Sequence, residues 1–526
     1  MSKKDSDLNF DQKTRDLSSF KEKIIDLYNK GKGSEDIAAN ELLARSLLPP
    51  LTAKERNFSA VSSMYPIYYS DKCVGCLECV VACPDAAILA RVNTDAEVQD
   101  GLVKIEQVEE REFFKSKFVK TTKYWSVYER KNKTPALFSL WIDPTKCKGC
   151  EECVEICHSG AHDALKMISK TEHKMEFENK ASHFVNNVLP ITKDEFIDPR
   201  LYTDLFLIEN AWVYQGGAGS CRGCGEMTAL KMALAVTGAK YGKDMVIVAA
   251  TGCNSVFSST YPWNIFSVPW TNSLFENSPA VALGVRMRLN QTGKKSTKVW
   301  VVGGDGAMND IGFQSLSRVL MSQEDIKILV LDTQVYSNTG GQVSCSTFMG
   351  QDAKMGAYGK VSHGKKEYRK ELGLIAMAHP QIFVAQVSPA YFNHFFKTVH
   401  EALEFPGPAL IIAYSPCMPE HGVSDDLSFD RAKAAVMSRA FPIFVYNPKR
   451  GNTIKENLDL KGNPSVNEDW HKDPKTGEIC DFIWFAKKEG RFSKSFNKEG
   501  LPNELLKQSQ EERAKNWHVL KELAQI

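Results

Sequence analysis

The sequence has almost no net charge and no long hydrophobic run. Lysine and arginine total 66 against 64 for aspartate and glutamate, a formal net charge of +2 at pH 7. Such a balance gives no reason to expect a nucleic acid or an anionic membrane as partner. No apolar stretch approaches the roughly 20 residues that cross a bilayer. The start, MSKKDSDLNFDQ, lacks both the apolar core of a signal peptide and an acid-free, arginine-rich presequence. We therefore predict a soluble, cytoplasmic protein without a membrane span.

Cysteine is what the sequence does have. Of its 14 cysteines, most fall into tight runs that no disulfide framework requires, so metal clusters in a reducing compartment fit better. At 526 residues the chain is long enough for about three domains, which makes a single-domain protein improbable.

The composition divides the chain into four segments. Residues 1–58 are polar with short amphipathic stretches, and we predict an arm that packs on another domain or subunit. Residues 59–195 contain both dense cysteine runs around a polar insertion. Residues 196–423 are rich in short apolar runs. Residues 424–526 are charged, lack a strand–helix alternation and end in a helical pattern, so we predict a wrapping extension there.

Within residues 196–423, short β-rich apolar runs alternate with helix-like segments. A continuous apolar run is typical of a strand that is buried on both faces, so the pattern predicts a parallel sheet between layers of helices. Such sheets bind ligands at the carboxyl ends of their strands. The runs are residues 245–248, 299–302, 328–331, 382–385 and 410–412.

Two cysteine runs share the C-x2-C-x2-C-x3-C spacing of bacterial two-cluster ferredoxins. A short loop can wrap three thiolates around one cubane, while the fourth cysteine points to the other cluster. We therefore predict two 4Fe-4S clusters, one held by Cys73, Cys76, Cys79 and Cys157 and the other by Cys147, Cys150, Cys153 and Cys83. Structural zinc is the alternative, but four-cysteine zinc sites do not need this crossed arrangement.

The second run departs from the ferredoxin pattern in one place. Pro84 follows the first run, whereas His158 takes the equivalent position after the second. Proline would fix the turn after the ligand, so we expect the surroundings of the two clusters to differ. We interpret His158 as a solvated or locally hydrogen-bonded side chain rather than a ligand.

A glycine-rich turn follows the apolar run at residues 299–302. In Gly304-Asp305-Gly306 the glycines let the backbone approach a diphosphate, and the helix that follows favours its charge. Alone the motif is weak, but the next apolar run leads into a polar turn at residues 332–342. The pairing resembles the motif of thiamine-diphosphate enzymes, in which an acid and a downstream residue share Mg2+ with the diphosphate.

Most thiamine-diphosphate enzymes have an Asn pair where this chain has Asp332-Thr333. This variant resembles pyruvate:ferredoxin oxidoreductases, and the resemblance covers about Ala60 to the end of the chain. Four further segments agree with that family: CRGCGE at 221–226, ATGC at 250–253, PWTNSLFE at 269–276 and YSPC at 414–417.

The resemblance implies the residues of the site. Mg2+ should bind to Asp305, to the Thr333 hydroxyl and to the Val335 carbonyl, and Asn338 should lie beside the reactive thiazolium ring of the cofactor. The other implied cofactor-binding residues are Gly304, Gly306, Ala307 and Thr339. A third 4Fe-4S cluster, which spacing alone would not define, should be held by Cys221, Cys224, Cys253 and Cys417. The remaining Cys345 and Cys480 are interpreted as ordinary buried thiols.

The resemblance also implies fold and activity. We expect an α/β chain in which a parallel-sheet, thiamine-diphosphate-binding domain follows an α+β two-cluster ferredoxin-like domain. The implied reaction converts pyruvate and coenzyme A to acetyl-CoA and CO2, with electrons passing through three clusters to ferredoxin or flavodoxin. 2-Oxoglutarate or another 2-oxoacid remains an alternative substrate. Two rival functions are a pure electron-transfer subunit and a non-redox thiamine enzyme such as a carboligase.

Finally, the family holds the pyrimidine end of the cofactor with a glutamate on a separate α/β domain. The roughly 70 residues before the first cysteine run are too few for a domain built from βαβ units. We therefore expect a partner subunit that carries the pyrimidine-binding domain, in a hetero-oligomer, with residues 1–58 as a candidate part of the contact.

Overall fold

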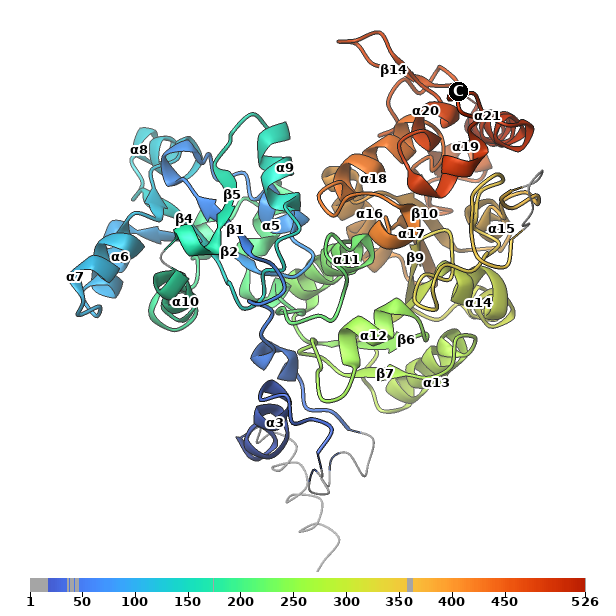
Figure 1. The fold of residues 1–526 in the computed structure, drawn as a ribbon. Coiled ribbons are helices and arrows are strands. Elements are labelled where there is room, and N and C mark those ends of the chain that lie inside the picture. Colours follow the sequence, from blue (N-terminus) through green and yellow to red (C-terminus); the bar gives the residue numbers. More distant parts are fainter. Residues whose placement is uncertain are drawn as a thin grey trace, which may run out of the picture.

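The computed structural model describes residues 18–35, 37, 42, 47–173, 175–356 and 363–525. A smaller cysteine-rich part and a larger α/β part lie side by side, and the N-terminal helices lie next to their junction (Figure 1). No helix among the described residues is both long and apolar enough to cross a membrane.

The α/β part is built on one eight-stranded sheet with the strand order β13-β12-β10-β11-β9-β8-β6-β7. In this order the six neighbouring strands from β10 to β7 run parallel to one another, as the alternation of apolar runs and helices predicts. They are β6 (Met245–Ala249), β7 (Trp270–Asn272), β8 (Lys298–Gly304), β9 (Ile326–Asp332), β10 (Phe383–Val387) and β11 (Ala409–Tyr414). Each of the five predicted runs forms a strand of this sheet, and the expected α/β fold class is confirmed.

Helices cover both faces of the sheet, and alternate strand residues enter two different cores. Leu329 packs in the core formed with α11 (Gly225–Tyr241) and α16 (Phe392–Glu404). Val330 packs in the core formed with α13 (Ser278–Gln291) and α14 (Phe313–Leu320). Burial on both faces explains why the strands are apolar throughout rather than alternating.

The C-terminal segment adds two short strands to the sheet, which its sequence pattern did not indicate. β12 (Phe444–Tyr446) pairs antiparallel with β10, and β13 (Leu458–Asp459) pairs with β12. Strands of three and two residues are too short to produce a readable alternation. The segment also forms α18 (Ser428–Met437), α19 (Ile454–Asn457), β14 (His471–Lys472), β15 (Ile479–Cys480), α20 (Phe482–Ala486) and α21 (Glu504–Ala524).

The cysteine-rich part contains two small antiparallel sheets. β1 (Met64–Tyr68) pairs with β5 (Leu165–Ser169), and β4 (Ala136–Ile142) lies between β2 (Ile88–Thr94) and β3 (Phe118–Val119). Each cysteine loop leads into a short helix, and these two helices, α5 (Glu78–Ala82) and α9 (Glu152–Ser159), pack together. The insertion between the runs and the segment after them form α6 (Asp95–Leu102), α7 (Val108–Lys115), α8 (Val127–Arg130) and α10 (Met175–His183).

The described part of the N-terminal arm contacts both parts of the chain. The ring of Tyr28, in the helical segment 18–29, lies edge-on to Tyr261 and Trp263 of the α/β part, with centroids 5.9 and 6.3 Å away. Further on, the amide of Ala53 donates to the carbonyl of Asn264 at 3.1 Å. Lys146 of the cysteine-rich part donates to the carbonyl of residue 54 at 2.5 Å. Residues 1–17 of the arm lie outside the described residues.

Candidate functional site

The two cysteine runs surround two cavities in the crossed grouping that their spacing predicts. One cavity is lined by Cys73, Cys76, Cys79 and Cys157. A second is lined by Cys83, Cys147, Cys150 and Cys153. The fold thus brings three cysteines of each run together with the last cysteine of the other.

The two loops reach this arrangement through the same backbone conformations. Gly75 and Gly149, at equivalent positions, have φ of +74° and +68°. Leu77 and Glu151 two residues later have φ of +68° and +70°. At Gly149 a Cβ atom would lie 2.4 Å from the hydroxyl oxygen of Ser62, so only glycine fits. These left-handed residues turn each loop around its cavity, which is what wrapping a cluster requires.

The cavities differ from a site for a single metal ion. Among the described ranges, no group of three or more His, Cys, Asp or Glu side chains is placed to hold one ion. In an iron–sulfur cubane each thiolate binds a different iron, so the sulfurs surround a space rather than meet at one point. His158, outside both cavities, is exposed, and its Nδ1 lies 2.7 Å from Asp163 Oδ1. This is the local hydrogen bond that the sequence predicts for it.

A third group of four cysteines lines a cavity of about 190 Å3 at the carboxyl edge of the large sheet. Cys224 directly precedes α11, Cys253 begins α12 (Cys253–Ser259) after β6, and Cys417 follows β11. Cys221 completes the group. The members lie far apart in the sequence, and only the fold brings them together.

A neighbouring cavity is lined by every residue that the resemblance assigns to cofactor or Mg2+ binding. These are Gly304, Asp305, Gly306, Ala307, Thr333, Val335, Asn338 and Thr339. Gly304 ends β8 and the next three residues follow it, whereas the other four follow β9, so the site lies where two adjacent parallel strands end. Glu226, Cys253, Thr333, Ser337 and Asn338 also line the third cysteine cavity, so the two cavities adjoin.

The oxygens predicted to bind Mg2+ contact one another. Asp305 Oδ1 accepts hydrogen bonds from the amide and the hydroxyl of Thr333, both at 3.1 Å. The same hydroxyl lies 3.0 Å from the carbonyl oxygen of Val335. Ser344 donates its hydroxyl to Asp305 Oδ2 at 2.6 Å. Burial, and secondly the charge of Asp332, raise the pKa of Asp305 to about 8.

This donor set fits a hard cation with a diphosphate. It consists of a carboxylate, a hydroxyl and a carbonyl, the oxygen ligands that Mg2+ prefers. A Cβ atom added at Gly304 would meet only the carbonyl oxygen of Leu331, at 3.9 Å, so the glycine leaves the cavity wall open to a ligand. A buried carboxylate such as Asp305 is costly without a compensating positive charge, and a bound cation would supply it.

Sequence reasoning missed two polar residues of this site. Glu226 is buried, and its Oε2 has no hydrogen-bond partner among the described residues. Burial, followed by the charge of Asp305, raises the pKa of Glu226 to about 8. Ser337 donates to Glu226 Oε1 at 3.5 Å, and its oxygen lies 3.3 Å from the sulfur of Cys253. Glu226 directly follows the Cys-x-x-Cys-Gly segment, a signal that could have indicated it.

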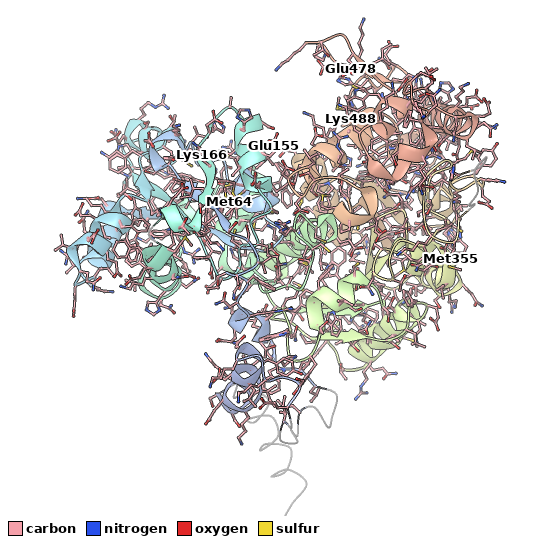
Figure 2. All side chains as sticks on the ribbon, in the orientation of Figure 1. Met64, Glu155, Lys166, Met355, Glu478 and Lys488 are labelled. Atoms are coloured by element: carbon pink, nitrogen blue, oxygen red, sulfur yellow. The ribbon has the colours of Figure 1, made fainter. Side chains whose placement is uncertain are left out.

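One of the two remaining cysteines is not where the sequence interpretation placed it. Cys480 is buried, as expected. Cys345 is exposed, so its interpretation as a buried thiol is wrong. It lies on a loop that borders an open cavity together with Asp310 and Met355. Met355 lies on the side of the α/β part that faces away from the cysteine-rich part (Figure 2).

Buried charged side chains fix the cysteine-rich part to the α/β part. Lys148, between two cysteines of the second run, donates to the carbonyls of Ala218 and Ser220 at 2.9 and 2.8 Å. Its ammonium also lies 2.6 Å from Asp85 Oδ1. Lys231 of α11 donates to the carbonyls of residues 80 and 83. The second cysteine cavity is therefore held beside the loop that leads to Cys221.

Comparison with known proteins finds a thiamine-diphosphate domain and a 4Fe-4S domain in this chain. Residues 250–413 match the family described as thiamine pyrophosphate enzyme, C-terminal TPP binding domain. Residues 66–89 match the 4Fe-4S binding domain, a range that includes the first cysteine run but not the second. A probable pyruvate-flavodoxin oxidoreductase of Escherichia coli is 30% identical over 77% of this chain and 38% of its own. Over most of its length the chain is therefore similar in sequence to proteins named pyruvate-flavodoxin or pyruvate:ferredoxin oxidoreductase.

A second relative also matches most of this chain but less than half of its own length. The pyruvate:ferredoxin oxidoreductase of Moorella thermoacetica is 27% identical over 82% of this chain and 40% of its own. The chain thus spans about two fifths of the length of these relatives. Among solved structures, a 2-oxoglutarate:ferredoxin oxidoreductase from Magnetococcus marinus has a TM-score of 0.35 and 22% identity, over 41% of this chain and 69% of that one. The predicted resemblance, with its thiamine-diphosphate and 4Fe-4S domains, is confirmed.

Proposed function

We propose that the chain is a subunit of a 2-oxoacid:ferredoxin oxidoreductase that converts pyruvate and coenzyme A to acetyl-CoA and CO2 and reduces ferredoxin or flavodoxin. One observation carries the proposal: the cavity around Asp305 and the cavity lined by Cys221, Cys224, Cys253 and Cys417 share five lining residues. A site suited to thiamine diphosphate therefore adjoins a site suited to a cluster. A non-redox thiamine enzyme does not require a cluster site next to the cofactor. A pure electron-transfer subunit does not require a site for Mg2+ and a diphosphate.

In this proposal Asp305, the Thr333 hydroxyl and the Val335 carbonyl hold Mg2+, which binds the diphosphate. The glycines at 304 and 306 let the backbone approach it, with Ala307 and Thr339 beside them. Asn338, which borders both cavities, contacts the reacting end of the cofactor. When bound, thiamine diphosphate supplies the electron sink that decarboxylation of a 2-oxoacid requires.

Twelve cysteines hold three 4Fe-4S clusters in the proposal, one in each cavity. Cys221, Cys224, Cys253 and Cys417 would hold a cluster beside the cofactor, where it could accept electrons. Lys148 joins the loop of the second cavity to the loop of Ser220, so a cluster held there would be next in the chain. Cys73, Cys76, Cys79 and Cys157 would hold the cluster that supplies the soluble carrier.

The proposal includes a second polypeptide. The described residues contain one large, mostly parallel sheet, and in the proposal the ends of its strands bind only the diphosphate end of the cofactor. We place the pyrimidine-binding domain on a partner subunit, so the cofactor binds at the interface of a hetero-oligomer. Residues 1–58 are a candidate part of that contact.

The test starts from the native source. The tagged chain is purified anaerobically, co-purifying chains are identified, and reduction of a viologen dye is measured with pyruvate and, separately, with 2-oxoglutarate. The proposal expects bound thiamine diphosphate and dye reduction that depends on a 2-oxoacid and coenzyme A. The preferred 2-oxoacid identifies the substrate. A preparation without thiamine diphosphate that reduces no dye with any 2-oxoacid would contradict the proposal and favour a pure electron-transfer subunit.

A further inference from the structure

We infer that Arg491, in the C-terminal segment, is a positioning residue that holds Gln334 so that Thr333 and Val335 direct their oxygens to one point. The inference rests on the proposed function, in which that point is the Mg2+ site. It gives the C-terminal segment a role in cofactor binding in addition to its packing on the sheet.

The turn after β9 depends on an unusual backbone conformation. Gln334 has φ of +60°, in the left-handed region, although it is neither glycine nor asparagine. This conformation is sterically unfavourable for a long side chain, and such residues persist only where their surroundings hold them. Gln334 stands between Thr333 and Val335, so its conformation decides whether the Thr333 hydroxyl can lie 3.0 Å from the Val335 carbonyl. A relaxed Gln334 would move these two oxygens apart.

Gln334 is held through its backbone and its side chain. Its amide donates to Asp332 Oδ1 at 3.1 Å, and its carbonyl accepts from the Thr347 hydroxyl at 2.6 Å. Its side-chain nitrogen donates to Asp332 Oδ1 at 3.2 Å. Its side-chain oxygen accepts from Arg491 Nη1 at 2.9 Å. The contact with Arg491 is the one that comes from the C-terminal segment.

Arg491 is itself fixed on several sides. Its side chain is fully buried, and Nε lies 2.6 Å from Glu489 Oε2. Nη2 donates to the Tyr414 hydroxyl at 3.2 Å, at the end of β11. Its guanidinium lies 5.5 Å from the ring of Phe348. A planar guanidinium paired and stacked in this way has little freedom, so it can hold Gln334 in place.

The chain offers a matched control. Arg513, in α21, is equally buried, and its guanidinium lies 5.7 Å from the same Phe348 ring. It pairs with Glu371 at 2.6 Å and Glu512 at 3.0 Å. Neither partner belongs to the turn at residues 332–337. Loss of Arg513 therefore reproduces the loss of a buried arginine without the loss of the contact to Gln334.

The experiment measures cation and cofactor binding rather than turnover. Full-length chain, with any partner that co-purifies, is titrated with Mn2+ in the presence of thiamine diphosphate, and free Mn2+ is followed by electron paramagnetic resonance. Arg491→Gln should raise the apparent Kd at least about tenfold, the effect of one hydrogen bond to a charged group. Arg513→Gln should leave the Kd within about threefold of that of the unaltered chain, even if it lowers the melting temperature as much as Arg491→Gln does.

A second set of variants tests whether Arg491 acts on the cation site through Gln334. Glycine adopts positive φ without strain, so Gln334→Gly should bind Mn2+ and thiamine diphosphate more tightly than Gln334→Ala. Adding Arg491→Gln to Gln334→Gly should then change the Kd by less than about threefold, because the residue that Arg491 holds is gone.

The outcomes are separable. Equal losses of Mn2+ affinity in Arg491→Gln and Arg513→Gln would overturn the inference, and so would an undiminished Arg491→Gln effect in the Gln334→Gly background. Iron content and melting temperature of each variant show whether it has folded, and Arg491→Lys replaces Arg491→Gln if the latter fails to fold. An unaltered chain that binds neither Mn2+ nor thiamine diphosphate would overturn the proposed function itself, and the inference with it.

Discussion

Thr333 donates both its amide and its hydroxyl to the same carboxylate oxygen of Asp305, each at 3.1 Å. The two residues follow the adjacent parallel strands β8 and β9, whose carboxyl ends lie side by side, and this brings the two residues into contact. It forms one wall of the cavity around Asp305, which shares five lining residues with the third cysteine cavity. The proposed chemistry depends on this junction, and the following predictions test it and its surroundings.

Asp305→Ala should abolish Mg2+-dependent binding of thiamine diphosphate, because a carboxylate facing a dication and a diphosphate has no neutral substitute. Asp310→Asn is the control, since Asp310 accepts the amide of Cys345 and lies outside the cavity. Isothermal titration calorimetry in the presence and absence of Mg2+ measures the effect. Affinity retained in Asp305→Ala would show that the assignment is wrong.

Removing single cysteines should remove single clusters. We expect about twelve iron atoms in the anaerobically purified chain, and about four fewer in each of Cys150→Ala and Cys417→Ala. Cys480→Ala should keep all of them, because Cys480 is buried in the C-terminal segment and lines none of the three cysteine cavities. Iron and acid-labile sulfide analysis checks the counts. If Cys417→Ala loses no iron, the third cluster is misassigned.

Glu152 should be needed for docking of the cysteine-rich part. Its two carboxylate oxygens accept the amides of Ser428 and Phe429 at the start of α18, both at 2.9 Å. Glu152→Ala leaves two buried amides without partners, at about 1–3 kcal/mol for each. We expect a lower melting temperature and faster proteolytic release of the cysteine-rich part. Glu155→Ala, further along α9, should change neither, and equal behaviour of the two variants would contradict the role of Glu152.

Lys327 should make stability depend on pH. It is buried in β9 and donates to the carbonyls of Phe405 and Gly407, and burial lowers its pKa from 10.5 to about 8. Since the unfolded chain binds this proton more tightly, the contribution of Lys327 to stability rises as pH increases from about 8 to about 10.5. The difference in unfolding free energy between the native chain and Lys327→Met should rise over that range, by at most roughly 1.4 kcal/mol per pH unit. Chemical unfolding at several pH values measures it, and a difference independent of pH would refute the assignment.

The sequence predicted the features that depend on local pattern. The five apolar runs form strands because burial on both faces leaves a readable signature, and the crossed cysteine grouping follows from spacing within two short loops. The group of Cys221, Cys253 and Cys417 was accessible only through the resemblance, since its members come from separate loops. Glu226 and Arg491 act through tertiary contacts that no local pattern encodes. The strands β12 and β13 were too short to be recognised.

The proposed function is tested most directly by measuring whether a 2-oxoacid reduces the clusters of this chain. The anaerobic complex of the chain with its partner, supplied with Mg2+, thiamine diphosphate and coenzyme A, is mixed with pyruvate while the visible absorbance and the electron paramagnetic resonance of the clusters are followed. We expect bleaching and reduced-cluster signals in the native complex. We expect neither in a complex that carries Asp305→Ala, although dithionite should still reduce that variant. Clusters that stay oxidised with pyruvate and every other 2-oxoacid, or equal reduction in the variant, would contradict the proposed function.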